Sequence, residues 1–391
     1  MAKAIQEYLK RATLLADWFV ANQVTKGGFA DRGRFANCAF VGKKEYPLVF
    51  SSNWTTGMTC ISLLMTWQRT KEEKYLKSAK LAGEYIKSLQ IHDNRNKAAY
   101  GLIRETTPQS TMCHPRDSIS AAWGLLHLYM NTKEKEYMYC VNLFANWFEK
   151  YAVKNNYPAW SSFVEKGKKS YWQLGSFHGG TPLFFFDLYQ VTKKKKWLNL
   201  GLKICDRWTQ LFLKPDGSIR IEIDPKTGKD MTGVGNDQNH LGWQDMHKFN
   251  DDFTAQAQMR AYKLTKNKKY LETAQKYLDW ILTVQEPKGY FGEPPVNSAA
   301  ATLILELKDL YDITKEKKYL NAMAKSVPHF LSLQEVKSKD LRFKGGFYCV
   351  DGDGGNYEHN KRVALGVRTS CYALAALLRL DQKIKYVGYT S

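Results

Sequence analysis

The stretch LTKNKKYLETAQKYLDWILTVQ, residues 264–285, contains the pattern that decides the fold. Its apolar residues recur at intervals of three and four, as an amphipathic helix requires. The same template returns behind a Thr-Lys pair at 70–90, 131–151, 191–213 and 313–334, and a copy without that pair begins at Ala4. A Thr just before each helix suits an N-cap region. The sequence therefore predicts six related amphipathic helices.

A second kind of helix is predicted between these copies. The intervening segments carry less charge and more small residues, and they cover roughly 54–68, 117–130, 179–191, 251–264, 298–311 and 368–381. Small residues let helices pack closely, so we expect these six inside and the charged copies outside. Alternation of outer and inner helices predicts an all-α fold, an (α/α)6 toroid, with residues 1–391 as one domain. An open α-solenoid is the alternative, but uneven loop lengths favour a closed ring.

The connections between the predicted helices differ at the two ends of the ring. Inner-to-outer connections are short, whereas outer-to-inner connections are long and often contain Gly beside an aromatic residue, as in GYFG at 289–292. Long irregular loops in a compact fold tend to carry function. They all precede inner-helix N-termini, whose free N–H groups favour anions. We therefore expect a cleft for an anionic ligand at this end.

Composition narrows the classes of partner. The 58 basic and 38 acidic residues give a net charge of +20, which favours anionic partners. No nucleic-acid module, Gly-rich nucleotide motif or apolar run of about 20 residues is visible, so we expect no nucleic acid, no cofactor and no membrane span. The seven cysteines lack framework spacing. The protein is expected in the cytoplasm, or secreted or periplasmic if a signal peptide has been removed.

Metal binding is not predicted. DGDGGNYEH at 351–359 resembles a calcium loop but lacks the terminal Glu, and no close histidine motif supports zinc. Asp117 and Asp251 are interpreted as helix N-caps.

An acidic polysaccharide substrate matches the polar residues of the long loops. A uronic acid chain breaks by β-elimination when its carboxylate is neutralised, a base removes the C5 proton and an acid protonates the leaving oxygen. The required set is an amide, a His, a Tyr and positive charge. The loops offer Asn239, His240, Tyr290 and either Arg116 or Arg342.

A short motif in this set resembles a known family. Asn239-His240-Leu241-Gly242-Trp243 is similar to the Asn-His-x-x-Trp element of alginate lyases and related polyuronate lyases with helical-toroid folds. The resemblance implies that Asn239 neutralises the carboxylate, that His240 is the base and that a Tyr one hairpin downstream, here Tyr290, is the acid. The sequence departs from that family at Gln238, where a second Asn is usual, and at Lys288, where an Arg is usual.

Further residues complete the predicted site. His178 is an alternative neutraliser or base, and Arg116 and Arg342 are expected to supply charge in subsites. Candidate sugar platforms and further substrate-binding residues are Trp54, Trp172, Trp243, Asn53, His247, Tyr357, His359 and Arg362. Three other interpretations stay open: a glycoside hydrolase resembling unsaturated glucuronyl hydrolases, a sugar epimerase on the same fold, and a toroid that only binds an anionic glycan or protein.

Overall fold

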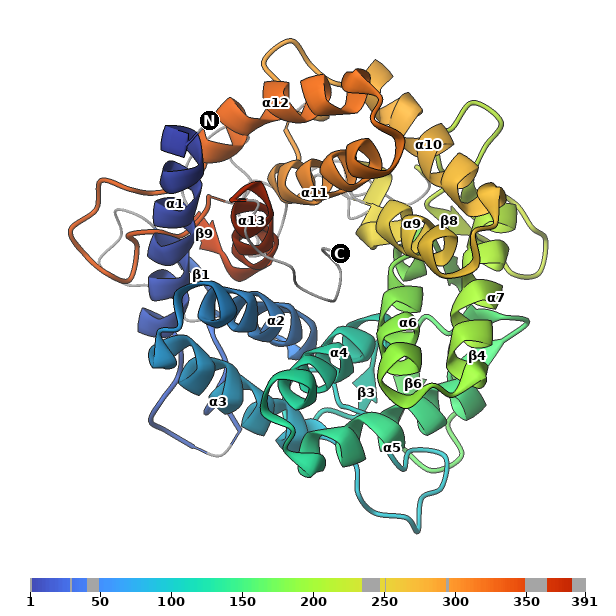
Figure 1. Cartoon of the computed structure of the whole chain (residues 1–391). Coiled ribbons are helices and arrows are strands. Elements are labelled where there is room, and N and C mark those ends of the chain that lie inside the picture. Colours follow the sequence, from blue (N-terminus) through green and yellow to red (C-terminus); the bar gives the residue numbers. More distant parts are fainter. Residues whose placement is uncertain are drawn as a thin grey trace.

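The computed structural model describes residues 2–28, 30–40, 49–233, 247–249, 251–292, 295–348 and 364–381. Within these ranges the helices alternate along the chain between an outer and an inner ring (Figure 1). The outer helices are α1 (Ala2–Ala21), α3 (Glu73–Leu89), α5 (Lys135–Tyr151), α7 (Lys195–Phe212), α10 (Lys268–Thr283) and α12 (Lys317–Ser332). The inner helices are α2 (Asn53–Thr70), α4 (Pro115–Thr132), α6 (Thr181–Thr192), α9 (Thr254–Thr265), α11 (Asn297–Thr314) and α13 (Val367–Leu380). The predicted (α/α)6 toroid is confirmed.

Burial separates the two rings as the residue pattern predicted. Inner helices are buried on nearly every side, so that Asn297 to Leu310 of α11 are all buried. An outer helix such as α10 buries one face only, through Tyr270, Ala274, Tyr277, Leu278 and Ile281. A helix that is apolar on one stripe packs against a core, whereas one buried all round must lie inside it. Among the described residues, no helix is long and apolar enough to cross a bilayer.

The ring is closed by contacts between the first and last hairpins. Strand β1 (Ala36–Phe40) pairs antiparallel with β9 (Ala364–Gly366) and with β2 (Val49–Phe50). Inner helix α13 packs on both α1 and α2, and Arg69 of α2 forms an ion pair with Asp381. All of these contacts except the β1–β2 pair join segments more than 300 residues apart, which excludes the open solenoid.

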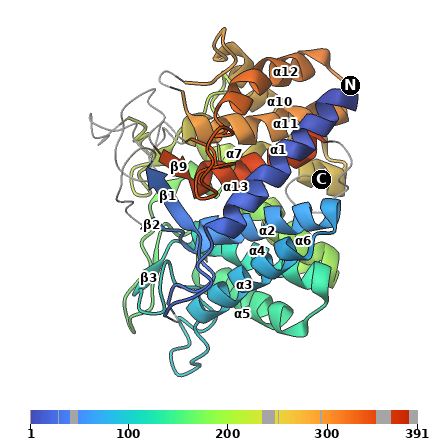
Figure 2. The same cartoon turned by 90° about the vertical axis from the view of Figure 1, so that its left-hand side faces the viewer.

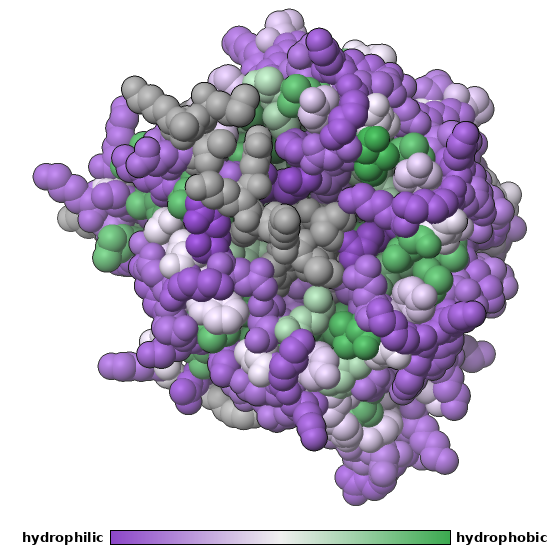
Figure 3. Space-filling view, viewed as in Figure 1, coloured by the Kyte–Doolittle hydropathy of each residue, from purple (hydrophilic) through white to green (hydrophobic). Residues whose placement is uncertain are grey.

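The Thr-Lys pairs end the inner helices, so the prediction that Thr caps the outer helices was wrong. Thr70, for example, is the last residue of α2, and its hydroxyl donates to Thr66 O and accepts from the N–H of Glu72. The following lysines, at 71, 133, 193, 266 and 315, lie in the left-handed region with φ of 58–63°. The turns lie at the end of the ring that Figure 3 shows, where hydrophilic residues dominate.

The Gly-aromatic elements of the long loops prove to be structural. Gly345 has a φ of 108°, and a Cβ there would lie 2.2 Å from Leu14 O on α1. Gly33, Gly101, Gly217 and Gly289 make the same close approach to the next outer helix. In four of the five repeats a buried or half-buried Gln just after the outer helix holds this loop. The amide of Gln334, for example, donates to Gly345 O and to Arg11 O. These loops are therefore fixed to the outer wall.

Short strands cover the opposite end from the Thr-Lys turns (Figure 2). Besides the β1 sheet they form three two-stranded pairs, each contributed by the long loops. The pairs are β3 (Met112–Cys113) with β6 (Ser162–Phe163), β4 (Val153–Lys154) with β5 (Tyr157–Pro158), and β7 (Leu174–Gly175) with β8 (Glu222–Ile223). This end holds the N-termini of the inner helices.

Candidate active site

A cavity of about 280 Å³ lies where the N-termini of several inner helices converge. Five elements supply most of its wall: the first turns of α2, α4 and α13, and the 3-10 turns Ser176–His178 and Asp251–Phe253 that precede α6 and α9. The described residues that line it are Trp54, His114, Arg116, Asp117, Trp160, Phe177, His247, Asp252 and Arg368. The cleft predicted at the long-loop end is therefore present in the described part of the chain.

One wall of the cavity holds a cluster of Glu105, His114 and Asp117. The side chains of Glu105 and Asp117 are 17% and 23% exposed, and Glu105 Oε2 accepts the backbone N–H of His114. Burial raises the pKa of Asp117 well above its usual range, and the neighbouring Glu105 carboxylate raises it further. Against the opposing effect of burial, Glu105 and Asp117 raise the pKa of His114 to about 9.

The two carboxyl groups of this cluster differ in acidity. Hydrogen bonds from His114 and Asp117 lower the pKa of Glu105 although burial opposes this. Two carboxylates this close repel each other, so the second ionises only at a higher pH than the first. Glu105 is therefore the more acidic member, and Asp117, which lines the cavity, holds its proton to higher pH.

The opposite wall holds a buried ion pair and an adjacent imidazole. Arg116 donates to Asp252 Oδ1 at 2.8 Å, to Phe177 O at 3.0 Å and to Ser120 Oγ at 2.6 Å. His247 Nδ1 lies 3.3 Å from Asp252 Oδ2. Burial lowers the pKa of His247 to about 4; Asp252 opposes this effect, and the charges of Arg368 and Arg116 add to it. His247 is therefore a neutral imidazole next to a carboxylate.

The backbone that delivers Asp252 is strained. Asp252 and Phe253 have φ of 52° and 68°, which non-glycine residues rarely adopt. The turn fits because Gly179 and Gly180 lie against it, and a Cβ on Gly180 would meet Asp252 O at 2.0 Å. Strain of this kind persists only where the surroundings hold it in place, and it is frequent at active sites.

The ring of Trp54 contacts two arginines at the cavity. The guanidinium carbon of Arg368 lies 5.0 Å and that of Arg116 5.7 Å from the centre of its ring. Its Nε1 donates to Tyr372 Oη at 3.2 Å, which fixes the orientation of the ring. Attraction between cation and ring then holds both guanidinium groups at the cavity.

The structure brings three of the predicted site residues together: Trp54, Arg116 and His247 all line the cavity. His178 lies directly behind it, with its ring 4.7 Å from that of Phe177. Burial, helped by the charge of Arg116, holds the pKa of His178 well below its usual range. Asn53 is fully buried, and its amide donates to Arg104 O and Ser118 Oγ, so it fastens two loops.

Three other predicted residues lie outside the cavity lining. The ring of Tyr290 packs 5.3 Å from that of His329 on outer helix α12. Arg342 is exposed and forms an ion pair with Asp340. The ring of Trp172, the third of these residues, lies 5.9 Å from Lys154 Nζ. The remaining predicted residues lie outside the described part of the chain: Asn239, His240, Trp243, Tyr357, His359 and Arg362.

Sequence reasoning gave too little weight to Asp117 and Asp252. The N-cap of α4 is His114, not Asp117, and the N-cap of α9 is Phe253, so the interpretation of Asp117 as a cap was wrong. Its signal was the segment HPRD at 114–117, in which Pro115 opens the helix and places Asp117 in the first turn. The signal for Asp252 was the pair Gly179-Gly180. The reason for these glycines is visible only in the structure, where they lie against the turn that carries Asp252.

Glu105, His114 and Asp117 form the one group of metal-ligating side chains in the described residues, with ligand atoms within 4.8 Å of one another. A metal ion requires a neutral imidazole and ionised carboxylates. The raised pKa values of His114 and Asp117 favour protons there instead. The cluster therefore fits a proton donor better than a metal site.

No family model matches this sequence, and no curated protein sequence matches it. Solved structures do match. Cellobiose 2-epimerase from Bacillus thermoamylovorans aligns over 97% of this chain and 100% of its own, at 12% identity and a TM-score of 0.74. The fold is that of the (α/α)6 toroid enzymes. An unsaturated glucuronyl hydrolase specific for heparin aligns over 97% and 99% at 15% identity and a TM-score of 0.69.

A third neighbour is a family 76 glycoside hydrolase from a bovine Bacteroides thetaiotaomicron strain. It aligns over 96% of this chain and 77% of its own, at 15% identity and a TM-score of 0.69. All three neighbours are named for action on carbohydrates, as epimerase or hydrolase. At these identities the likeness establishes the fold, and the chemistry has to be argued from the cavity.

Proposed function

We propose that this protein is a glycoside hydrolase that cleaves a bond next to an anionic sugar, with Asp117 as the general acid. The observation that carries the proposal is the position of Asp117 in the cavity lining beside Glu105, where the pKa of Asp117 is raised and that of Glu105 is lowered. A carboxylic acid whose pKa is raised by burial and by a neighbouring carboxylate is the proton donor that glycoside cleavage needs.

Charge in the cavity favours an anionic substrate. The lining holds three cationic side chains, Arg116, Arg368 and His114, whose pKa is raised to about 9. Its two acidic side chains are Asp252 and Asp117, and the raised pKa of Asp117 favours its neutral form. The partial positive charges of the converging helix N-termini add to this excess. A cavity of about 280 Å³ is at the small end for ligand pockets, which suits a single sugar unit rather than a long segment.

His247 supplies a second group for proton transfer. Its Nδ1 lies 3.3 Å from Asp252 Oδ2, which favours the tautomer with the proton on Nδ1, in which Nε2 carries the basic lone pair. A pKa of about 4 is that of an ordinary carboxylate, the base that most glycosidases use. In the proposed reaction the water oxygen attacks the sugar carbon, its proton passes to His247, and Asp117 protonates the leaving oxygen.

β-Elimination is the second candidate, and the neutral state of His247 beside two arginines favours it. Arg116 and Arg368 would offset the charge of a uronate carboxylate while a neutral histidine removes the C5 proton. In that case Asp117 would still protonate the leaving oxygen. Asn239 and His240 stay the predicted neutraliser and base for this reaction.

Products distinguish the two reactions. The protein is incubated with alginate, glucuronan, heparin and chondroitin sulfate, and with unsaturated oligosaccharides made from them. Hydrolysis releases reducing ends without new ultraviolet absorbance, or with a loss of it from an unsaturated substrate. β-Elimination adds the absorbance of a C4–C5 double bond. If neither reducing ends nor absorbance change on any substrate, both candidates are wrong.

The role of Asp117 has its own test. Asp117→Asn should lower kcat by about 10²- to 10⁴-fold, the usual contribution of a general acid, with an unchanged melting temperature. Glu165→Gln, at an exposed acid paired only with Lys168, is the matched control and should leave turnover unchanged. Because the protonated form acts, wild-type turnover should fall as pH rises through the raised pKa of Asp117. Near-normal turnover of Asp117→Asn would remove it from the mechanism.

A further inference from the structure

A second concave site lies on the outer wall of the ring, away from the cavity. It is a groove of about 730 Å³ between α5 and the loop at 94–100, and we name it the α5 groove. Tyr100, Tyr139, Asn142 and Asn146 are among its lining residues. Tyr139 is 54% exposed, one of few large side chains so exposed in the described structure.

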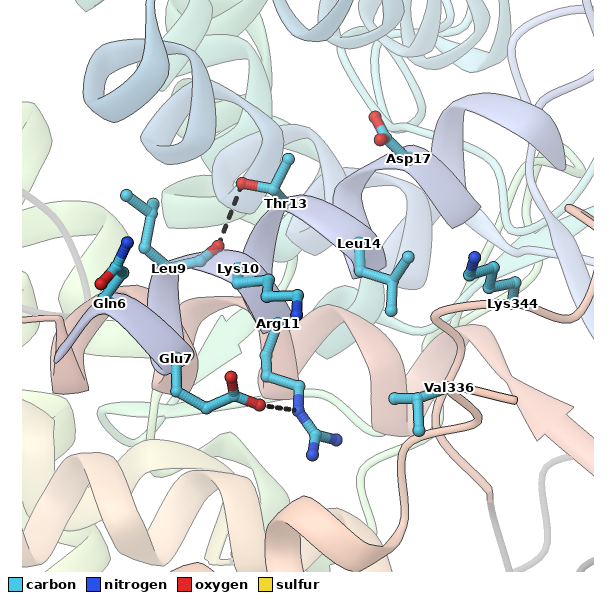
Figure 4. Close-up of a pocket in the computed structure, with 10 residues that line it drawn as sticks. All are labelled: Gln6, Glu7, Leu9, Lys10, Arg11, Thr13, Leu14, Asp17, Val336 and Lys344. Atoms are coloured by element: carbon cyan, nitrogen blue, oxygen red, sulfur yellow. Dashed lines mark hydrogen bonds and ion pairs between the residues drawn. The ribbon is translucent and has the colours of Figure 1, made fainter. Parts of the chain in front are cut away.

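The repeat provides an internal comparison for this groove. A Cβ on Gly101 would lie 2.5 Å from Leu143 O of α5, and one on Gly345 would lie 2.2 Å from Leu14 O of α1. Leu143 and Leu14 are therefore equivalent positions on two outer helices. A groove of about 750 Å³ lies at the α1 position too, and Figure 4 shows its residues. The two grooves share a backbone design but differ in side chains.

Side chains that the fold requires recur in every repeat. We call the helix carbonyl that the loop glycine approaches the contact carbonyl; on α5 it is Leu143 O. Trp147 lies four residues after it. Its counterparts on α1, α3, α10 and α12 are Trp18, Tyr85, Trp280 and His329. An aromatic or imidazole ring at each copy indicates a packing role, and Trp147 is indeed buried with its Nε1 bonded to Ala98 O.

Tyr139 and Tyr100 do not follow this rule. The counterparts of Tyr139, four residues before the contact carbonyl, are Lys10, Lys77, Glu272 and Asn321. The counterparts of Tyr100, just before the glycine, are Lys344, Arg32, Asp216 and Lys288. In Figure 4 the α1 groove accordingly presents Lys10 and Lys344. The fold accepts charged residues at both positions, so packing does not explain the two tyrosines of the α5 groove.

The chemistry of the α5 groove is that of a sugar-binding surface. The neighbouring Tyr100 hydroxyl raises the pKa of Tyr139, and the His92 ring lies parallel to Tyr139 at 6.1 Å. Flat amphipathic rings pack on the apolar face of a sugar while their polar edge stays in water. Asn142 and Asn146 add amide groups where α1 has Thr13 and Asp17.

Charge identifies the kind of sugar. Of the ten described residues that line the α5 groove none is acidic, and Lys97 and Lys150 are basic. Neither lysine forms an ion pair with a described residue. Two cations without a carboxylate favour a ligand that carries carboxylate or sulfate groups.

We propose that the α5 groove binds a segment of an anionic polysaccharide, as a surface site separate from the cavity. The inference goes beyond the proposed function, since it concerns binding of polymer and requires no turnover. A site on the outer wall would hold a long chain near the protein while one of its ends enters the cavity. Binding at two linked sites raises the effective local concentration of the polymer.

The test is affinity electrophoresis of the full chain in gels that contain alginate, polygalacturonate, chondroitin sulfate or heparin. Wild type should be retarded by at least one polymer, and Tyr139→Ala should weaken that retardation by about tenfold in Kd, the loss typical of one well-placed aromatic contact. Lys10→Ala, at the equivalent position of the α1 groove, is the matched control. It also removes a positive charge, so it reports non-specific attraction, and it should bind as wild type does.

Three outcomes would overturn the proposal: retardation by none of the polymers, unchanged binding of Tyr139→Ala, or an equal loss in Lys10→Ala. Melting temperatures of both variants check the fold. Turnover of a short oligosaccharide that fills only the cavity should be unchanged in Tyr139→Ala. An inactive wild type that still binds polymer through Tyr139 would refute the proposed hydrolase and leave the surface site standing.

Discussion

Replacing Arg116 by Met should destabilise the protein by about 3–5 kcal/mol at pH 8. Methionine keeps the length and apolar character of the side chain but removes the guanidinium. The side chains of Arg116 and Asp252 are only 7% and 3% exposed, so water cannot replace the lost partner. An uncompensated buried carboxylate and two lost hydrogen bonds, to Phe177 O and Ser120 Oγ, produce a cost of this size.

The loss should shrink at lower pH because of His247. In wild type the charge of Arg116 helps to hold the pKa of His247 at about 4. Without Arg116 the Asp252 carboxylate attracts a proton to His247, so the folded-state pKa rises. A raised folded pKa adds stability that is present at low pH and is lost as pH rises. Each unit of that rise is worth about 1.4 kcal/mol, so Arg116→Met should be closer to wild type at pH 5.5 than at pH 8.

Urea denaturation followed by tryptophan fluorescence measures both effects. A double-mutant cycle with Asp252→Asn isolates the pair, and the combined variant should recover about 1–3 kcal/mol relative to the sum of the single losses. A cost below about 1 kcal/mol for Arg116→Met, or additive single losses, would refute the interpretation of the contact as a buried, mutually dependent ion pair. A loss that is the same at both pH values would refute the link to His247.

Three further predictions concern stability. Gly345→Ala should lower the free energy of unfolding by about 3 kcal/mol in urea denaturation, because its Cβ would meet a backbone carbonyl at 2.2 Å. The control is Gly167→Ala, with φ of 86° but open space around it, which should cost only about 1 kcal/mol. Equal losses in the two variants would contradict the close approach. His247→Gln should make the protein less sensitive to acid. A histidine with a folded pKa of about 4 and an unfolded pKa of about 6.5 makes wild type lose up to about 3 kcal/mol of stability as pH falls between those values. Parallel pH profiles of stability for wild type and variant would argue against a buried neutral imidazole. Lys193→Gly should stabilise the protein by up to about 1 kcal/mol, because glycine adopts a φ of 58° without strain. Lys315→Gly should stabilise it less, since that lysine also lies 5.4 Å from the Tyr311 ring. Calorimetric melting temperatures of the two variants measure the difference.

Much of the candidate site was visible in the sequence as a list of polar loop residues, but not as an arrangement. Trp54, Arg116 and His247 could be placed at one end of the ring because each precedes or begins an inner helix. Tyr290 shares that position along the chain, yet the structure turns it toward His329 on the outer wall. The direction in which a loop side chain points depends on which neighbour its backbone is fixed to, and local sequence carries no information on that contact.

The sequence by itself determined the ring. Six amphipathic copies alternating with six segments rich in small residues have one compact arrangement, because each apolar stripe must be buried and each inner helix needs neighbours on all sides. Tertiary structure alone decided which of these groups have shifted pKa values. The pKa of Asp117 is raised by its burial in the cavity wall and by Glu105, which lies in the loop that leads into α4. The pKa of His247 is lowered by its burial, and Arg368 and Arg116 from two other hairpins add to the effect. A pKa is set by burial and by charges a few ångströms away, and only the closed fold brings residues from distant hairpins to that distance.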